Sequence, residues 1–143
     1  MTLHLIKLGV GVDDLAHMRK LQEARRKERR QKPGTPHWTF TRNTPKRQAE
    51  LLEGGGSLYW VIRGVVRCRQ KLVGFDGQVD DEGRPYCRIK MQRKIVPTAP
   101  MAWQAFQGWR YLEPARAPPD LSSGDSADLP PEMAAELKRL GLL

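Results

Sequence analysis

The longest apolar run lies near the centre of the chain, in residues 57–72, directly after the triple glycine 54–56. Almost every residue up to Ile62 is apolar, and β-branched and aromatic residues predominate, which predicts a strand covered on both faces. Beyond Gly64, apolar or weakly polar residues alternate with basic ones, which are Arg67, Arg69 and Lys71. We therefore expect a second strand with one face in the core and a cationic opposite face.

The N-terminal part predicts a strand followed by a long helix. Residues 3–8 are apolar except for His4 and Lys7, and Asp13 is a plausible N-cap for a helix that begins at Asp14. The apolar stripe of this helix ends near Ala24, and residues 19–32 contain eight basic and two acidic residues. The second half of the helix therefore either projects into solvent or lies against an anionic partner.

A short strand and a second helix are expected next. Residues 37–41 alternate, with Trp38 and Phe40 on one face and His37, Thr39 and Thr41 on the other. Thr44 and Pro45 form a typical helix start, so we predict a helix over 45–53 that ends at the glycines.

The second half of the sequence predicts a hairpin and a short helix after a linker. Residues 75–84 read as a turn and residues 86–92 as a strand, with Arg88 and Lys90 on its cationic face. Residues 97–100 are expected to form a loop, and residues 113–131 a linker rich in Pro, Ser and Asp. Residues 132–143 predict an amphipathic helix, which leaves 1–112 as one domain.

These elements indicate the α+β class. We expect a strongly bent antiparallel sheet or a small β-barrel, with two helices on the N-terminal side and the short C-terminal helix. A chain of 143 residues is long enough to bury one substantial core.

The charge distribution points to a polyanionic partner. The net charge is +9, and residues 1–110 carry 22 Lys and Arg against 10 Asp and Glu. Nucleic acid is the first candidate and an anionic membrane surface the second; a basic surface that serves only solubility is the alternative. No apolar run approaches the roughly 18 residues that span a bilayer, and no export signal is evident, so we expect no membrane insertion and a cytoplasmic location.

Recognisable catalytic or cofactor motifs are absent from the sequence. It has no phosphate-binding glycine loop, no nucleophile elbow and no zinc-protease motif. The histidines are scattered, and Cys68 and Cys87 read as reduced core residues. We therefore assign no catalytic residue, no metal and no cofactor.

Aromatic and basic residues are interleaved, as in proteins that hold single-stranded nucleic acid. The candidates for phosphate contacts are Lys46, Arg47, Arg63, Arg67 and Arg69. The candidates for stacking, for a pocket or for base edges are His37, Tyr59, Gln70, Gln107, Trp109 and Arg110. Core packing is the competing interpretation for each aromatic residue, and we assign Trp60 and Phe106 to the core.

Our first hypothesis is a non-catalytic RNA-binding module with a basic groove. The second is an enzyme or binding protein for a small anionic ligand or nucleotide, with His37 or Cys68 as the reactive residue. The third is a protein-interaction module or homodimer that uses the C-terminal helix.

Two blocks of sequence are distinctive: Ser-Leu-Tyr-Trp-Val-Ile at 57–62 and Phe-Gln-Gly-Trp-Arg-Tyr at 106–111. With residues 1–8, 44–47, 50–52 and 69–70, they resemble the family catalogued as domain of unknown function 1489, found mostly in alphaproteobacteria. The resemblance spans most of residues 1–121 and implies no particular activity. At the level of fold, the pattern is similar to the small β-barrels of the PUA and ASCH group, which implies binding of RNA or modified bases.

Overall fold

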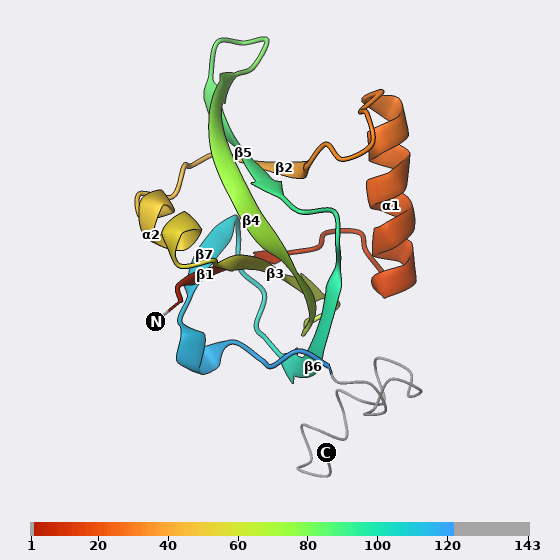
Figure 1. Cartoon of the computed structure of the whole chain (residues 1–143), viewed down its shortest axis with the longest axis vertical. Coiled ribbons are helices and arrows are strands. Elements are labelled where there is room, and N and C mark those ends of the chain that lie inside the picture. Colours follow the sequence, from red (N-terminus) through yellow and green to blue (C-terminus); the bar gives the residue numbers. More distant parts are fainter. Residues whose placement is uncertain (1, 122–143) are drawn as a thin grey trace.

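The computed structural model of the chain describes residues 2–121 (Figure 1). The strands are β1 (His4–Leu8), β2 (His37–Thr41), β3 (Ser57–Ile62), β4 (Val65–Val79), β5 (Pro85–Met91), β6 (Val96–Ala102) and β7 (Trp109–Leu112). The helices are α1 (Leu15–Glu28), α2 (Gln48–Glu53) and the 3₁₀ turn η1 (Pro114–Arg116). This arrangement agrees with the predicted α+β class.

The seven strands form one mixed sheet with the order β2-β5-β4-β3-β1-β7, and β6 pairs with β4. The expectation of an antiparallel sheet is wrong for one pair, because β1 and β3 run parallel. Parallel pairing requires a long crossover connection, and the segment from α1 to α2 between these strands provides it. The alternative expectation of a small barrel is also wrong, since β2 and β7 end the sheet without pairing with each other.

The central strand β3 is buried along its whole length. Leu58 and Trp60 pack in one core cluster with Met18 of α1 and Leu51 of α2. Tyr59 and Val61 face the other way, into a second cluster that contains Ile6 and Leu112. The prediction that both faces of 57–62 are covered is therefore confirmed.

The sheet curves strongly, so that residues beside its two edge strands, β2 and β7, are within hydrogen-bonding distance. Trp109 Nε1 of β7 donates a hydrogen bond of 2.8 Å to the carbonyl of Asn43, which lies just after β2. The backbone N–H of Arg47 donates to the hydroxyl of Tyr111, also in β7, at 3.0 Å. These bonds anchor the segment between β2 and α2 against β7 although the two edge strands do not pair.

Both predicted N-terminal helices form, with shifted bounds. The N-cap of α1 is Asp14 rather than Asp13, and its Oδ1 accepts a hydrogen bond of 2.7 Å from the His17 N–H. The helix ends at Glu28, and Arg30 just beyond it takes a left-handed φ of 53°, which is incompatible with continuing the helix. The second helix begins at Gln48, later than predicted.

Residues 97–100, predicted as a loop, belong to β6. Pro97 and Pro100 misled the prediction, but proline is compatible with a strand that lies at an edge, and among the strands of the described residues β6 pairs with β4 alone. The start of the predicted linker packs on this strand, because the N–H of Ala99 donates to Pro119 O and that of Leu121 to Pro97 O. The predicted helix 132–143 lies outside the described residues.

Between residues 2 and 121, no helix has the length and apolar character that a membrane-spanning segment requires.

Candidate nucleic-acid interface

Three of the residues predicted to contact nucleic acid lie in the interior. His37 is 1% exposed, Tyr59 4% and Gln70 0%. Side chains this deeply buried present no free ring face or amide edge to a ligand. Any binding surface therefore lies elsewhere on the molecule.

Gln70 has a structural role that the sequence did not reveal. Its Oε1 accepts hydrogen bonds from Gln22 Nε2 at 2.8 Å and from Trp60 Nε1 at 2.9 Å. Its Nε2 donates to Gln22 Oε1 and to the carbonyl of Gln92, both at 3.0 Å. The amide is thus fully paired in the core, where an unpaired polar group would be costly, and it attaches α1 to β3 and β4.

The two residues suggested for catalysis are also buried. Burial, and then the charges of Arg29, Arg25, Arg26 and Arg93, lower the pKa of His37 to about 3. Burial raises the pKa of Cys68 to about 12, and its Sγ lies 3.6 Å from Met18 Sδ. Near neutral pH the imidazole is therefore not a proton carrier and the thiol is not ionised, so neither residue supports the enzyme hypothesis.

Two of the predicted phosphate contacts are already paired with carboxylates. Arg47 Nε lies 3.1 Å from Glu50 Oε1, one turn along α2. Arg69 Nε and Nη2 each donate to the carboxylate of Asp120 at 2.7 Å, and Nη1 donates to Ser57 Oγ at 3.0 Å. These guanidinium charges are neutralised within the protein.

The remaining predicted residues are distributed over several elements. Lys46 is exposed before α2, Arg63 is exposed in the β3–β4 turn, and Arg67 is half-buried on β4. Trp109 is half-buried and its indole N–H is bonded to Asn43 O. Gln107, just before β7, and Arg110, within β7, are both exposed. Arg110 lines a wide cavity of about 800 Å³.

A different surface brings aromatic rings and guanidinium groups together. The register of β2 and β5 places Trp38 opposite Lys90 and Phe40 opposite Arg88, on the side that faces away from the core. Phe40 is 63% exposed, which is unusual for a large aromatic side chain. The predicted alternation in 37–41 is correct, but the histidine and threonine face is the inner one.

Two arginines lie over the ring of Trp38. The guanidinium carbon of Arg29, from the end of α1, is 3.5 Å from the ring centroid, and that of Arg88 is 4.2 Å from it. Arg29 Nη1 also donates to the Trp38 carbonyl at 3.1 Å. Tyr86 lies edge-on to Phe40, with 6.3 Å between ring centroids. We call the surface formed by Arg29, Trp38, Phe40, Tyr86 and Arg88 the aromatic–arginine face.

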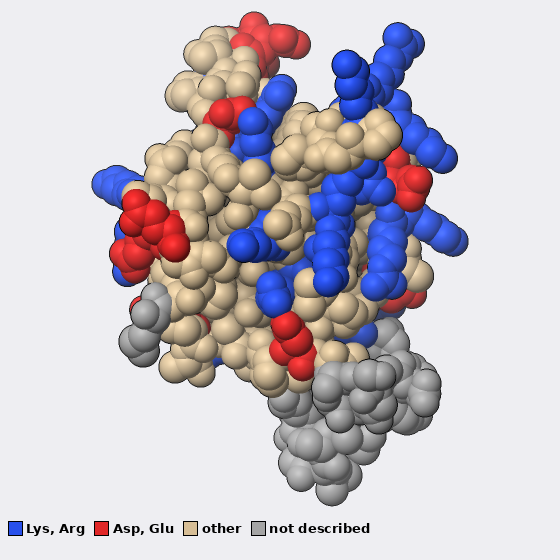
Figure 2. Space-filling model, in the orientation of Figure 1, with Lys and Arg blue, Asp and Glu red and all other residues tan. Residues whose placement is uncertain are grey.

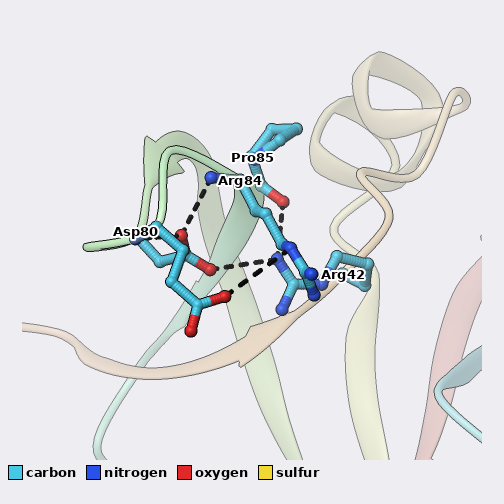
Figure 3. A network of polar contacts seen from close by, with 5 residues as sticks. Arg42, Asp80, Arg84 and Pro85 are labelled. Atoms are coloured by element: carbon cyan, nitrogen blue, oxygen red, sulfur yellow. Dashed lines mark hydrogen bonds and ion pairs between the residues drawn. The ribbon is translucent and has the colours of Figure 1, made fainter.

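The far end of this face is fixed by the tip of the β4–β5 hairpin (Figure 3). Arg42 Nη1 donates to the carbonyl of Pro85 at 3.0 Å and lies 3.5 Å from Asp80 Oδ2. Asp80 Oδ1 accepts from the N–H groups of Glu82 and Arg84. Hydrogen bonds, first of all from the Arg84 backbone, lower the pKa of Asp80, so the turn keeps its charge and its shape near neutral pH.

The near end of the face opens into a cavity of about 320 Å³ between β1, α1 and β2. Lys7, Arg25 and Arg29 provide its charged lining, and Met18 and Trp60 contribute apolar lining. Phe40 and Arg29 line this cavity and also belong to the aromatic–arginine face. We call it the cationic cavity.

No carboxylate lines the cationic cavity among the described residues. Burial and the charge of Arg25 lower the pKa of Lys7, and burial and neighbouring arginines lower that of Arg29. In Figure 2, Lys and Arg side chains dominate the surface over α1 and beside it. The potential around the cavity is therefore strongly positive.

Sequence reasoning missed this surface although its components were visible. The pattern of 37–41 indicated a Trp38–Phe40 face, and the pattern of 86–92 indicated a face with Arg88 and Lys90. Only the pairing of β2 with β5 puts these two faces side by side. Lys7 was visible as a polar exception in an apolar strand, which is the signal that could have marked the cavity.

No group of three or more His, Cys, Asp and Glu side chains within residues 2–121 is arranged to hold a metal ion. No curated protein sequence and no solved structure is similar enough to match this chain. A family model does match, over residues 5–143, and its description is a protein of unknown function. Because this match covers nearly the whole chain, the protein belongs to the DUF1489 family.

Proposed function

We propose that this protein binds single-stranded nucleic acid, with RNA favoured over DNA, as a non-catalytic module. The observation that supports this most strongly is the exposed ring of Phe40, which lies on the outer sheet surface beside Trp38 and two guanidinium groups. The proposal keeps the mechanism expected from the sequence and moves it to the aromatic–arginine face.

The chemistry of this face fits a strand with unpaired bases. Every base has a flat π-surface that can stack on Phe40 or Tyr86, and each stacked base contributes about 1–3 kcal/mol. Leaving a phenylalanine ring in water forgoes roughly the 1.5–3 kcal/mol that its burial would provide, and a stacked base would recover part of this. Display of unpaired bases on an aromatic sheet surface is a common mode of RNA recognition.

Charge on the neighbouring helix supports binding that is independent of base sequence. Arg25 lies on α1 next to the face, and Arg29, which belongs to the face, is the C-cap residue of this helix. Neither makes an ion pair with another described residue. Their long-range field attracts the phosphate backbone and raises the rate of encounter. Binding roles for Lys46, Arg63, Arg67, Gln107 and Arg110 stay a prediction.

The test is a fluorescence anisotropy titration of a labelled single-stranded RNA of about ten nucleotides, a length suited to such surfaces. Phe40→Ala should weaken binding about tenfold, because it removes one stacking surface. The matched control is Val73→Ala, which truncates another exposed apolar side chain, on β4. This control should bind like the unmodified protein.

Affinity should also fall with salt, with log K decreasing by roughly 0.7 per log unit of salt for each phosphate neutralised. The same titration with DNA of identical sequence should give weaker binding. Absence of RNA binding at low salt would overturn the proposal, and so would equal affinities of the Phe40→Ala variant and the unmodified protein.

A further inference from the structure

The cationic cavity needs an explanation beyond general attraction of a strand. Lys7 follows Leu3 and Leu5 along β1 with a period of two residues, so it continues the row that faces the core. A lysine at such a position loses hydration, and no carboxylate of the described residues pairs with it. Cations kept half-buried and unpaired in a cavity are typical of a binding site.

The composition of the lining indicates the class of ligand. Three cationic groups, Lys7, Arg25 and Arg29, are gathered with no acidic group among the described lining residues. An ammonium and guanidinium groups together suit a compact oxyanion, because guanidinium binds two oxygens at once and lysine acts as a point charge. A ligand with two negative charges compensates the positive charge of these three groups better than a ligand with one. A terminal phosphate monoester carries close to two negative charges at neutral pH, whereas an internal phosphodiester carries one.

The cavity and the aromatic–arginine face are positioned for one continuous ligand. Phe40 borders both, and the guanidinium of Arg29 lies over Trp38 while it also lines the cavity. A strand that stacks on Phe40 would therefore bring its next phosphate to the mouth of the cavity. The apolar surface of Met18 and Trp60 limits the space, so the cavity suits a strand end better than a strand that passes through.

We propose that the cationic cavity binds a phosphate monoester at the end of the nucleic-acid strand that lies on the aromatic–arginine face. This inference rests on the proposed function, and it adds recognition of a phosphorylated strand end. The bound oxyanion accepts hydrogen bonds from Lys7, Arg25 and Arg29.

The experiment compares RNAs of one sequence that carry a phosphate or a hydroxyl at the 5′ end, and the same pair for the 3′ end. One of the two phosphorylated ends should bind about tenfold more tightly than its hydroxyl form, as expected for charge-assisted hydrogen bonds. Equal affinity for phosphate-ended and hydroxyl-ended strands at both ends would overturn the inference. The proposed function would then still stand if the hydroxyl-ended strand binds and depends on Phe40.

Variants show whether the preference arises in the cavity. Lys7→Met keeps a long apolar side chain and should abolish most of the preference for the phosphorylated end. The matched control Lys20→Met removes a lysine that is exposed on α1 and does not line the cavity. It should slightly lower the affinity for both the phosphate-ended and the hydroxyl-ended strand and leave the ratio of the two affinities unchanged.

Arg25→Gln provides a second variant, because Arg25 is exposed on α1 and its loss leaves the core intact. It should also reduce the preference, while a thermal melt reports folding in every variant. If Lys7→Met and Arg25→Gln both fold and both keep the preference, the phosphate binds elsewhere and the inference is wrong.

A competition arm separates a strand end from a free nucleotide as the source of the phosphate monoester. Adenosine monophosphate lacks the neighbouring stacked bases, so it should displace the phosphorylated strand only at concentrations at least about a hundredfold above the strand's dissociation constant. Displacement at concentrations close to that constant would mean that the cavity is a nucleotide site, which would overturn the assignment to a strand end.

Discussion

Two arginine-rich regions of this protein differ in how their charge is compensated. At the start of α2 and on β4, Arg47 pairs with Glu50 and Arg69 with Asp120, so each of these guanidinium groups has a carboxylate partner. Around β2 and the end of α1, Arg25 and Arg29 have no such partner among the described residues. Arginines are visible in the sequence of both regions. The charges of Arg47 and Arg69 are compensated by carboxylates, whereas those of Arg25 and Arg29 are left for an external anion, so the position of carboxylates is more informative than the number of arginines.

The largest expected effect comes from removing the anchor that holds α1 beside the sheet. Gln70→Leu leaves Gln22, the Trp60 indole N–H and the Gln92 carbonyl without their partner. Since each unpaired buried polar group costs about 1–3 kcal/mol, the free energy of unfolding should fall by about 3 kcal/mol in a urea titration.

Gln107→Leu is the control for this substitution, because Gln107 is exposed before β7. It should change stability by less than about 0.5 kcal/mol, as surface substitutions usually do. Equal effects of the two substitutions would show that the amide network does not stabilise the fold.

The comparison of the two regions is tested directly by paired double substitutions. Arg25→Ala with Arg29→Ala should weaken RNA binding about a hundredfold and reduce the salt dependence by roughly 0.7 for each phosphate that is no longer neutralised. Arg47→Ala with Arg69→Ala removes the same formal charge from the compensated region and should weaken binding less than about threefold. Anisotropy titrations measure both, and a larger loss of affinity for the second pair would reverse the assignment of the site.

Burial of His37, reinforced by the positive charges of neighbouring arginines, makes the fold sensitive to acid. In the folded protein its pKa is about 3, against an ordinary value of 6.5. Below pH 6.5 the unfolded chain binds a proton that the folded chain excludes, so stability is complete above pH 6.5 and falls as the pH is lowered toward 3. At pH 5 this costs about 2 kcal/mol relative to pH 7.

Urea titrations of the unmodified protein and of His37→Leu at pH 7 and pH 5 check this effect. The difference between the two pH values should shrink by about 2 kcal/mol in the variant. His4, whose pKa is lowered by burial and by Arg69, is present in both proteins and cancels in the comparison. An unchanged difference would mean that His37 does not resist protonation in the fold.

The smallest expected effect comes from removing a carboxylate from the compensated region, which makes its charge more like that of the region around β2 and α1. Asp120→Asn removes the partner of Arg69 and frees a guanidinium on the compensated side. Stability should fall by less than about 1 kcal/mol, because the pair is partly exposed to solvent. RNA affinity should rise about twofold at low salt through the added net charge. A decrease in affinity would indicate that Asp120 itself supports binding.

Local pattern was sufficient to predict many of the elements. The buried strand at 57–62 and the alternating strand at 37–41 follow from apolar periodicity, and so does a helix after the first strand, although its N-cap is Asp14 and not the predicted Asp13. The parallel pairing of β1 with β3 could not be predicted in this way, because it depends on a crossover that includes two helices and a strand. The strand at 96–102 was hidden by its prolines.

The candidate site was harder to predict for a specific physical reason. Alternation shows which residues share a face, but it does not show which face is inside. His37 looked reactive and is in the core, whereas Phe40, which was given no binding role, is 63% exposed. Likewise, Gln70 resembled a base reader because single-residue reasoning cannot see the amide of Gln22 that lies against it.

The paired amides of Gln22 and Gln70 also set the rotation of α1 about its own axis. An α-helix turns about 100° per residue, so a slip of one residue would replace Gln22 by a leucine or a glutamate at Gln70 and would carry Arg25 and Arg29 away from the cavity. A residue inserted between Gln22 and Arg25 would change the angle between the buried amide and both arginines. The length of this one stretch of helix is thus as much a determinant of the site as the identity of its residues.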